Sequence, residues 1–268
     1  MNREDRQVPL AVGRELPAIE RAVEAIVAGI RKGGRLFYVG AGTSGRLGVL
    51  DAAECPPTYG VSPRLVQGII AGGKRAMIGA VEGAEDSVAN GVRDLRAKKI
   101  GPADVVVGIA ASGTTPYVLS ALTYARRHGA ITVGVTSNRN APISRVAAIV
   151  IAPQVGSEVV TGSTRLKAGT SQKLVLNMLS TAAMVRLGHV YENLMIDVAM
   201  TNQKLRGRGL RILAEASGKS PSAARHALRQ SGHNLRTALI MLKRGLDAGS
   251  ARARLLSTKG NLRQALGE

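Results

Sequence analysis

The chain has 268 residues, of which 45% are hydrophobic, and this length allows one large domain and a small one. It contains no Trp and only 2% aromatic residues, so its core must be built from aliphatic side chains, and platforms for stacking on nucleic acid bases are scarce. The single cysteine, Cys55, excludes an intrachain disulfide, and no apolar run approaches the roughly 18 residues of a membrane span, so we expect a cytoplasmic protein without a membrane partner.

Positive charge is concentrated towards the C-terminus. The net charge of the chain is +19, and residues 201–268 hold 14 Lys and Arg against 3 Asp and Glu, which is +11. Such a segment could bind nucleic acid or another anionic polymer. A solvated helical surface is the simpler interpretation and the one we favour, so we expect no nucleic-acid partner.

The first predicted element is an amphipathic helix over residues 8–32, in which apolar residues recur every three or four positions. A buried strand follows at 36–39, and a helix at 44–54. Pro56-Pro57 is expected to end that helix, because the residue before a proline is driven out of the α region. The remaining predicted strands are apolar runs that alternate with helices, at residues 65–70, 104–109, 131–135 and 148–151. A long helix is predicted at 166–186.

This alternation predicts an α/β fold with a doubly wound, mostly parallel sheet. The strand pattern ends near residue 197, and three short helices are predicted beyond it, at 220–230, 234–246 and 248–257. We therefore divide the chain into an N-terminal helix (1–25), a sheet domain (26–189), and a linker helix with a small helical C-terminal domain (190–268).

Two hydroxyl-bearing turns directly follow predicted strands, one at 40–45 and one at 111–115. In a parallel sheet such turns meet at the carboxyl edge, where ligands bind, and the backbone N–H groups of a helix start attract phosphate. Each hydroxyl could instead serve only as a helix cap. Two such turns on neighbouring strands favour a sugar-phosphate site whose candidate ligands are the side chains of Thr43, Ser44, Ser112, Thr114 and Thr115.

The first turn also matches the dinucleotide pattern G-x-G-x-x-G. That pattern alone is weak, and a dinucleotide site needs an acidic residue at the end of the second strand to hold the ribose. No Asp or Glu occurs between Glu54 and Glu82, which counts against a nicotinamide cofactor.

Two carboxylates are candidates for acid–base chemistry. Glu54 is predicted at the C-terminal end of its helix, where the helix dipole would raise its pKa, as a general acid requires. Glu85 is predicted near a helix start, which would keep it ionised as a general base. Spacing alone favours the alternative that both are ordinary solvated helix residues. The histidines have no metal-ligand spacing, so we expect no metal, and we expect the Cys55 thiol to have a raised pKa and not to act as a nucleophile.

Specific motifs resemble those of the N-acetylmuramic acid 6-phosphate etherases over nearly the whole chain. They include the run Gly40–Arg46, Glu-Cys-Pro-Pro-Thr-Tyr at 54–59, Val-Glu-Gly-Ala-Glu-Asp at 81–86 and Lys-Ala-Gly-Thr at 167–170. The resemblance implies a sugar isomerase (SIS) domain over 26–189 and a lyase that cleaves the D-lactyl ether of N-acetylmuramic acid 6-phosphate. The products would be N-acetylglucosamine 6-phosphate and D-lactate, in the recycling of peptidoglycan amino sugars.

The resemblance also assigns roles to residues. It implies that Glu54 is the proton donor, that Glu85 is the second active-site glutamate, that no cofactor is used, and that the chain pairs as a homodimer. The chain differs from the family at Thr114, where the family often has Arg, and it begins at an Asn-Arg-Glu-Asp segment that an extension usually precedes. The alternatives are a non-enzymatic sugar-phosphate-binding regulator, against which both glutamates argue, and a nucleic-acid-binding regulator that uses the basic C-terminal domain.

Overall fold

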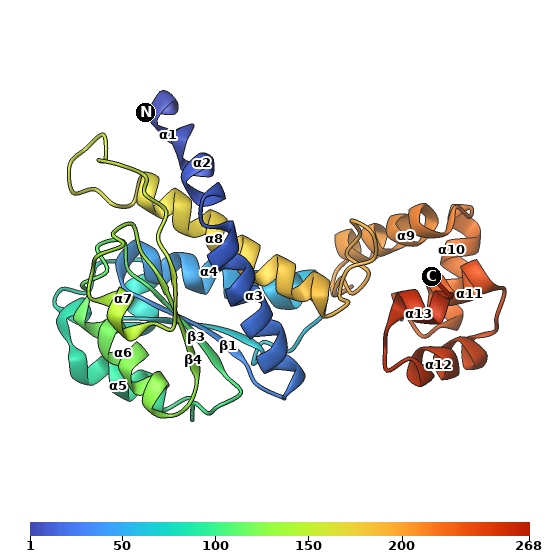
Figure 1. The fold of residues 1–268 in the computed structure, drawn as a ribbon. Helices are drawn as coiled ribbons and strands as arrows, with labels where there is room; N and C mark the ends of the chain where they lie inside the picture. The colour runs from blue at the N-terminus through green and yellow to red at the C-terminus, as the bar shows by residue number, and fades with distance from the viewer. The chain divides into compact units, whose positions relative to one another are not determined.

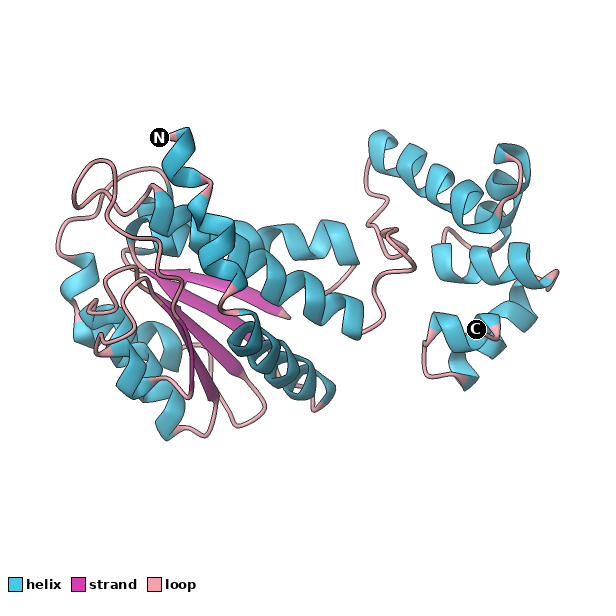
Figure 2. Cartoon of the chain, turned by 45° about the horizontal axis from the view of Figure 1, so that its top comes forward, coloured by secondary structure: helices cyan, strands magenta, loops and turns pink.

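A five-stranded parallel sheet forms the centre of the larger part of the chain (Figures 1 and 2). The computed structural model describes all residues, 1–268. The strand order is β2-β1-β3-β4-β5, with the bounds β1 Leu36–Gly40, β2 Val66–Ile70, β3 Val105–Ile109, β4 Ile131–Val135 and β5 Ile149–Ile151. Every neighbouring pair is parallel, which confirms the predicted α/β doubly wound class.

Helices cover both faces of this sheet, because β1 and β3 are apolar and buried along their whole length. Phe37 and Val39 pack in one core with α5 and α6, whereas Tyr38 points to the opposite face, towards α4. The elements of this part are α1 Asn2–Asp5, α2 Gln7–Gly13, α3 Leu16–Arg31, α4 Gly42–Tyr59, the 3₁₀ turns η1 Gly73–Met77 and η2 Ala84–Asp86, α5 Val88–Arg96, α6 Pro116–Arg127, α7 Ile143–Val146 and α8 Lys167–Arg186.

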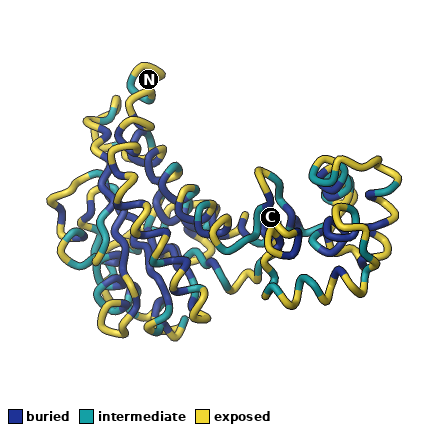
Figure 3. The backbone as a smooth tube through the Cα atoms, turned by 45° about the vertical axis from the view of Figure 1, so that its right-hand side comes forward, coloured by how far each residue is buried: buried dark blue, intermediate teal, exposed yellow.

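The chain divides into two compact units, which we call unit 1 and unit 2. Unit 1 consists of Met1–Cys55 and Ser62–Ala183, and unit 2 of Pro56–Val61 and Met184–Glu268. Each unit has an apolar core of its own, and Figure 3 shows the buried residues of the chain in dark blue. None of the helices is long and apolar enough to cross a membrane.

The first helix differs from its prediction, because the single helix expected over 8–32 is broken near residue 15 into α2 and α3. Pro17 stands in the first turn of α3 and lacks the N–H that would continue a helical ladder from α2. Glu15 takes a long-range role at the break, where its buried carboxylate pairs with Arg139 and accepts a hydrogen bond from the N–H of Ala152. The break therefore fastens the start of α3 to the sheet domain.

The helix α4 does not end before its proline pair, and this prediction was wrong. It continues through Pro56 and Pro57 to Tyr59, and Gly60 follows in the left-handed conformation typical of a helix C-terminus. The two prolines leave the carbonyls four residues earlier without N–H donors, but only within the last turns of a helix that packing already holds. Glu54 therefore lies more than one turn inside α4 instead of at its end.

Unit 2 is a bundle of five short helices with its own apolar core. Their bounds are α9 Gln203–Ser217, α10 Pro221–Gln230, α11 Leu235–Arg244, α12 Ala248–Ser257 and α13 Leu262–Leu266. The central helix is α11, whose buried residues include Leu235, Leu239 and Ile240. Three of these helices match the predicted ones to within two residues at each end, α9 lies in the segment where a linker helix was expected, and α13 is additional.

Candidate active site

The first turn is held by close contact between the end of β1 and the start of α4. A Cβ added at Gly40 would lie 2.7 Å from the backbone N of Gly45, and one added at Gly45 would lie 2.6 Å from the side chain of Ile70. Glycine is therefore required at both positions for the helix to begin this close to the strand. The start of α4 is brought to the carboxyl edge of the sheet, as the sequence predicted.

The hydroxyl groups of the first turn are not equally available. Ser44 is buried, and its Oγ donates a hydrogen bond to Oε1 of Gln172 on α8 at 2.9 Å. Thr43 is half-buried next to Gly169 of the same helix. Ser44 thus joins two helices of unit 1, and Thr43 is the more accessible hydroxyl of the pair.

The second turn lies beside the first, because Gly40 of β1 pairs in register with Ile109 of β3. This strand order places the two turns where the winding of the sheet reverses, which is the usual ligand crevice of such folds. The hydroxyls of Ser112 and Thr114 lie 2.9 Å apart, and Thr115 stands at the N-cap of α6 without using its side chain to cap that helix. The Thr115 hydroxyl is consequently available to a ligand.

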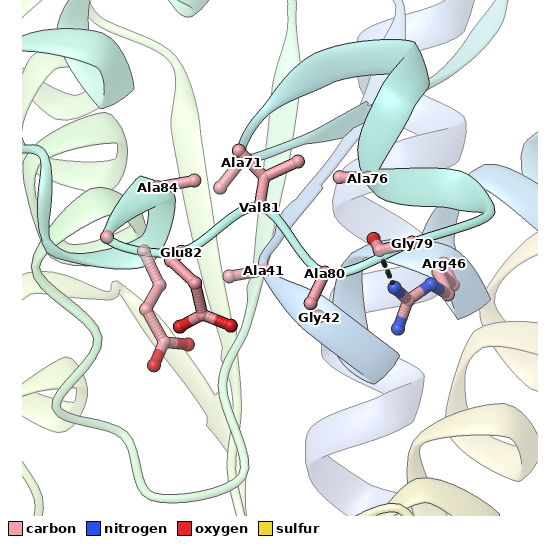
Figure 4. A pocket seen from close by; sticks show the side chains of 12 residues that line it. Ala41, Gly42, Arg46, Ala71, Ala76, Gly79, Ala80, Val81, Glu82 and Ala84 are labelled. Atoms are coloured by element: carbon pink, nitrogen blue, oxygen red, sulfur yellow. Dashed lines mark hydrogen bonds between the residues drawn. The ribbon is translucent and has the colours of Figure 1, made fainter.

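A pocket of about 210 Å³ opens between the first turn and the segment that follows β2 (Figure 4). Glu85 of η2 lines this pocket, together with Glu82 and with Arg46 from the start of α4. The turn η2 packs against α6, the helix that begins at the second turn. The carboxylate predicted as the base is therefore close to both hydroxyl turns.

Arg46 forms hydrogen bonds with the segment after β2 that forms one wall of the pocket. Its Nε donates to the carbonyl of Met77 at 3.2 Å, and its Nη2 donates to the carbonyl of Gly79 at 3.0 Å. Neither Arg46 nor Glu82 was singled out in the sequence as a functional residue, although both lie inside motifs that carried the family resemblance. A cation in the first turn of a helix that begins at an anion site was the signal that could have identified Arg46.

Glu54 does not line this pocket. It is exposed, and it lies eight residues beyond Arg46 on α4, which corresponds to about 12 Å along the helix axis. Within one chain the structure therefore brings Glu85, but not Glu54, to the pocket. The five predicted hydroxyl residues stand near the same edge of the sheet but also do not line the pocket itself.

Beneath Glu54, the inner face of α4 carries buried polar groups. The Oδ1 atom of Asp51 accepts hydrogen bonds from Nδ2 of Asn177 at 2.7 Å and from Oγ of Ser180 at 3.2 Å. Burial raises the pKa of Asp51, and these neutral donors only partly offset the effect. Burial, together with the nearby Asp51 and Glu54, raises the pKa of the Cys55 thiol to about 12, in the direction expected from the sequence.

Lys167, the first residue of α8, is buried. Only 2% of its side chain is exposed, and its Nζ donates to Oε2 of Glu4 at 2.8 Å. The N–H groups of Lys167 and Ala168 donate to the carboxylate of Glu158, which thereby caps α8. No cluster of His, Cys, Asp and Glu side chains is suited to hold a metal ion.

The strand order and the paired turns are those of a ligand-binding α/β protein, and the family models place it in the sugar isomerase class. The family model for the SIS domain matches residues 87–182, and the model for the glucokinase regulatory protein N-terminal SIS domain matches residues 18–126. A putative phosphosugar isomerase from Bacteroides fragilis has the same fold, with a TM-score of 0.51 and 21% identity over 70% of this chain and 90% of its own. A phosphoheptose isomerase from Neisseria gonorrhoeae has a TM-score of 0.53 and 15% identity over 67% and 92%.

More similar relatives match the chain over both of its units. The N-acetylmuramic acid 6-phosphate etherases of Yersinia pestis (strain Pestoides F) and Yersinia pseudotuberculosis serotype O:1b (strain IP 31758) are each 54% identical to the chain over 266 residues. The match covers 99% of this chain and 90% of each relative. The chain belongs to the N-acetylmuramic acid 6-phosphate etherase family.

Proposed function

We propose that this chain cleaves the D-lactyl ether of N-acetylmuramic acid 6-phosphate, releasing D-lactate and N-acetylglucosamine 6-phosphate. The observation that carries the proposal is identity of 54% to named etherases along almost the entire chain. The site supports it, because Glu85 lines a pocket next to two hydroxyl turns at the ligand edge of the sheet. This activity would serve the recycling of amino sugars from peptidoglycan in the cytoplasm.

The chemistry follows from the substrate, because an ether is a poor target for direct hydrolysis. In the open-chain sugar, the C1 aldehyde acidifies the hydrogen on C2. The Glu85 carboxylate removes that proton, the C3–O bond breaks, and Glu54 protonates the departing lactate oxygen. Water then adds across the conjugated C2–C3 double bond, with its hydroxyl going to C3 and a proton returning to C2. Each acid–base contact is worth about 10²–10⁴-fold in rate.

The phosphate of the substrate is assigned to the hydroxyl turns. Thr115 presents an uncommitted hydroxyl at the start of α6, and Ser112 and Thr114 stand beside it. The positive end of this helix favours an anion at the same place. Thr43 would contribute from the first turn, and Ser44 would hold that turn against α8.

The position of Glu54 leads to the assembly that we propose. Because Glu54 is exposed about 12 Å along α4 from Arg46, a second copy of the chain could bring its own Glu54 to this pocket. A symmetric homodimer would then contain two sites, each with Glu85 from one subunit and Glu54 from the other. This arrangement reconciles the roles implied by the family with the geometry of the single chain.

The alternative is a regulator that binds sugar phosphates without turning them over. The match to the SIS domain of the glucokinase regulatory protein favours its consideration. The presence of both Glu54 and Glu85 argues for the enzyme, since a sensor needs neither an acid nor a base.

The decisive experiment is to measure D-lactate release from N-acetylmuramic acid 6-phosphate by the purified wild type and by Glu54→Gln and Glu85→Gln. We expect release by the wild type, and rates lower by about 10²–10⁴-fold in each variant. A folded wild type that binds the sugar phosphate but releases no D-lactate would reject the enzyme and support the regulator.

A further inference from the structure

The pocket next to the first turn has charges of opposite sign at its two ends. Figure 4 shows the Arg46 guanidinium on one side and the Glu82 carboxylate on the other, with Ala41 and Ala80 between them. Arg46 is the only cation among the residues that line the pocket, and Glu82 and Glu85 are the only anions. An anionic group of a ligand would therefore be attracted to one end of this pocket and repelled from the other.

The guanidinium of Arg46 is fixed in position but not neutralised. Two of its five N–H groups donate to the carbonyls of Met77 and Gly79, which leaves three donors, including both on Nη1. Arg46 forms no ion pair with a carboxylate of its own chain. A planar cation held by backbone carbonyls, with donors to spare, is suited to grip a carboxylate with two parallel hydrogen bonds.

The substrate of the proposed function has two anionic groups, the phosphate on C6 and the lactyl carboxylate on the C3 substituent. The second turn offers the phosphate a helix start and free hydroxyls, and η2 with Glu85 packs against that same helix. A sugar with its phosphate on the second turn can thus present C2 to Glu85. In that pose the substituent on C3 would extend towards Arg46, because Glu85 and Arg46 line the same pocket.

We propose that Arg46 binds the carboxylate of the lactyl group and thereby determines that the ligand is a muramic acid derivative. The inference rests on the proposed function, and it identifies the part of that site which binds the lactyl substituent on C3. N-acetylglucosamine 6-phosphate shares the phosphate and the ring but lacks the lactyl carboxylate. Arg46 therefore discriminates the substrate from the sugar product, and its loss removes that discrimination without removing sugar-phosphate binding.

The test compares affinities for these two sugar phosphates by calorimetry, in a Glu54→Gln background that prevents turnover. We expect Arg46→Gln to weaken the binding of N-acetylmuramic acid 6-phosphate by about 10- to 100-fold, the value of hydrogen bonds to a charged partner. Binding of N-acetylglucosamine 6-phosphate should stay unchanged. Arg46→Lys keeps the charge but not the planar guanidinium. Its affinity for N-acetylmuramic acid 6-phosphate should therefore lie between those of Arg46→Gln and of the protein with arginine at this position.

Arg75→Gln is the matched control, because Arg75 is exposed on η1 and does not line the pocket, yet the variant loses the same charge. It should bind both sugars as the wild type does. An equal loss of both sugars in Arg46→Gln would overturn the proposal, since Arg46 would then serve the phosphate or the shape of the pocket. Unchanged binding of both would overturn it as well. A wild type that prefers the muramic acid derivative but releases no D-lactate would reject the etherase activity and leave the assignment of Arg46 intact.

Discussion

Polar side chains serve different ends at the helix starts of unit 2 and at the candidate site of unit 1. In unit 2, all five helices begin with a residue whose side chain accepts a hydrogen bond from the helix N-terminus: Asn202, Ser220, Asn234, Asp247 and Asn261. In unit 1, Thr115 stands at the start of α6 and makes no such bond. A capping side chain contributes about 1 kcal/mol to stability, so its omission at α6 leaves a hydroxyl and a helix terminus for a ligand.

Charged groups show the same contrast. In unit 2, Asp197 is bound by both Arg236 and His189, and Glu268 is held by Lys243 and Tyr191. At the pocket of unit 1, Arg46 has no ionic partner in the chain. Polar groups that already satisfy one another stabilise a fold, whereas groups left uncommitted at the edge of a sheet are those that a ligand can satisfy.

The largest effect is expected in an experiment that tests whether Glu54 and Glu85 of unit 1 act together across a dimer. Glu54→Gln and Glu85→Gln should each be nearly inactive alone. In the proposed homodimer, a mixed dimer would contain one site with both glutamates intact, so an equal mixture formed by refolding together should regain about a quarter of wild-type activity. Activity of the mixture that stays at the level of the separate variants would show that both glutamates come from one chain. Variants refolded separately and then combined under non-exchanging conditions are the control.

A smaller effect is expected from breaking the ion pairs that Asp197 of unit 2 forms with Arg236 and His189. Asp197→Asn keeps the shape of the side chain but leaves Arg236 and His189 facing a neutral amide, so we expect a loss of about 3–5 kcal/mol in unfolding free energy. Glu215→Gln, which neutralises an exposed carboxylate on α9, should change stability little. Equal denaturation midpoints for Asp197→Asn and Glu215→Gln would contradict a stabilising role for the network.

The pH dependence of Asp197 has a definite sign. Burial would raise its pKa, but hydrogen bonds from His189 and Arg236 outweigh burial and lower the pKa below the ordinary value of 3.8. Its contribution is therefore present above about pH 4 and is lost as the pH falls through the lowered value. The difference in melting temperature between wild type and Asp197→Asn should narrow in acid.

The smallest effect concerns Asp51 in unit 1, and its sign is opposite. Burial raises the pKa of Asp51 above 3.8, and the hydrogen bonds from Asn177 and Ser180 offset only part of this rise. The folded state then binds more protons than the unfolded state just above pH 4, so stability declines as the pH rises through that window. We expect the melting temperature of the wild type to fall relative to Asp51→Asn between pH 4 and pH 7. If the melting temperature of the wild type rose with pH relative to Asp51→Asn, as it should relative to Asp197→Asn, the distinction between the two aspartates would be contradicted.

The sequence predicted the strands well because each is a short apolar run, and parallel pairing buries such a run on both faces. The two hydroxyl turns were predicted for the same reason, since they follow directly from where the strands end. Local rules failed at α4, where the expected stop at Pro56 did not occur and the helix continued to Tyr59.

Contacts between distant parts of the sequence could not be predicted. Ser44 was one of five candidate ligands for the sugar phosphate, yet its partner is Gln172, 128 residues away. The burial of Lys167 depends on Glu4, 163 residues away. Arg46 was passed over because its place in the pocket depends on two carbonyl groups of another loop. Such pairings arise from tertiary packing, which neither periodicity nor spacing encodes.

The discontinuity of unit 2 has a consequence for how this protein can have evolved. Six of its residues, Pro56–Val61, come from the early part of the chain, and the N–H of Ala199 donates to the carbonyl of Pro57 at 3.1 Å. A Cβ at Gly60 would lie 2.5 Å from the carbonyl oxygen of Asp197. A gene fusion that appended only the C-terminal segment to another sugar isomerase domain would lack these contacts with the end of α4. Recombination between relatives would have to exchange both segments together to keep the contacts.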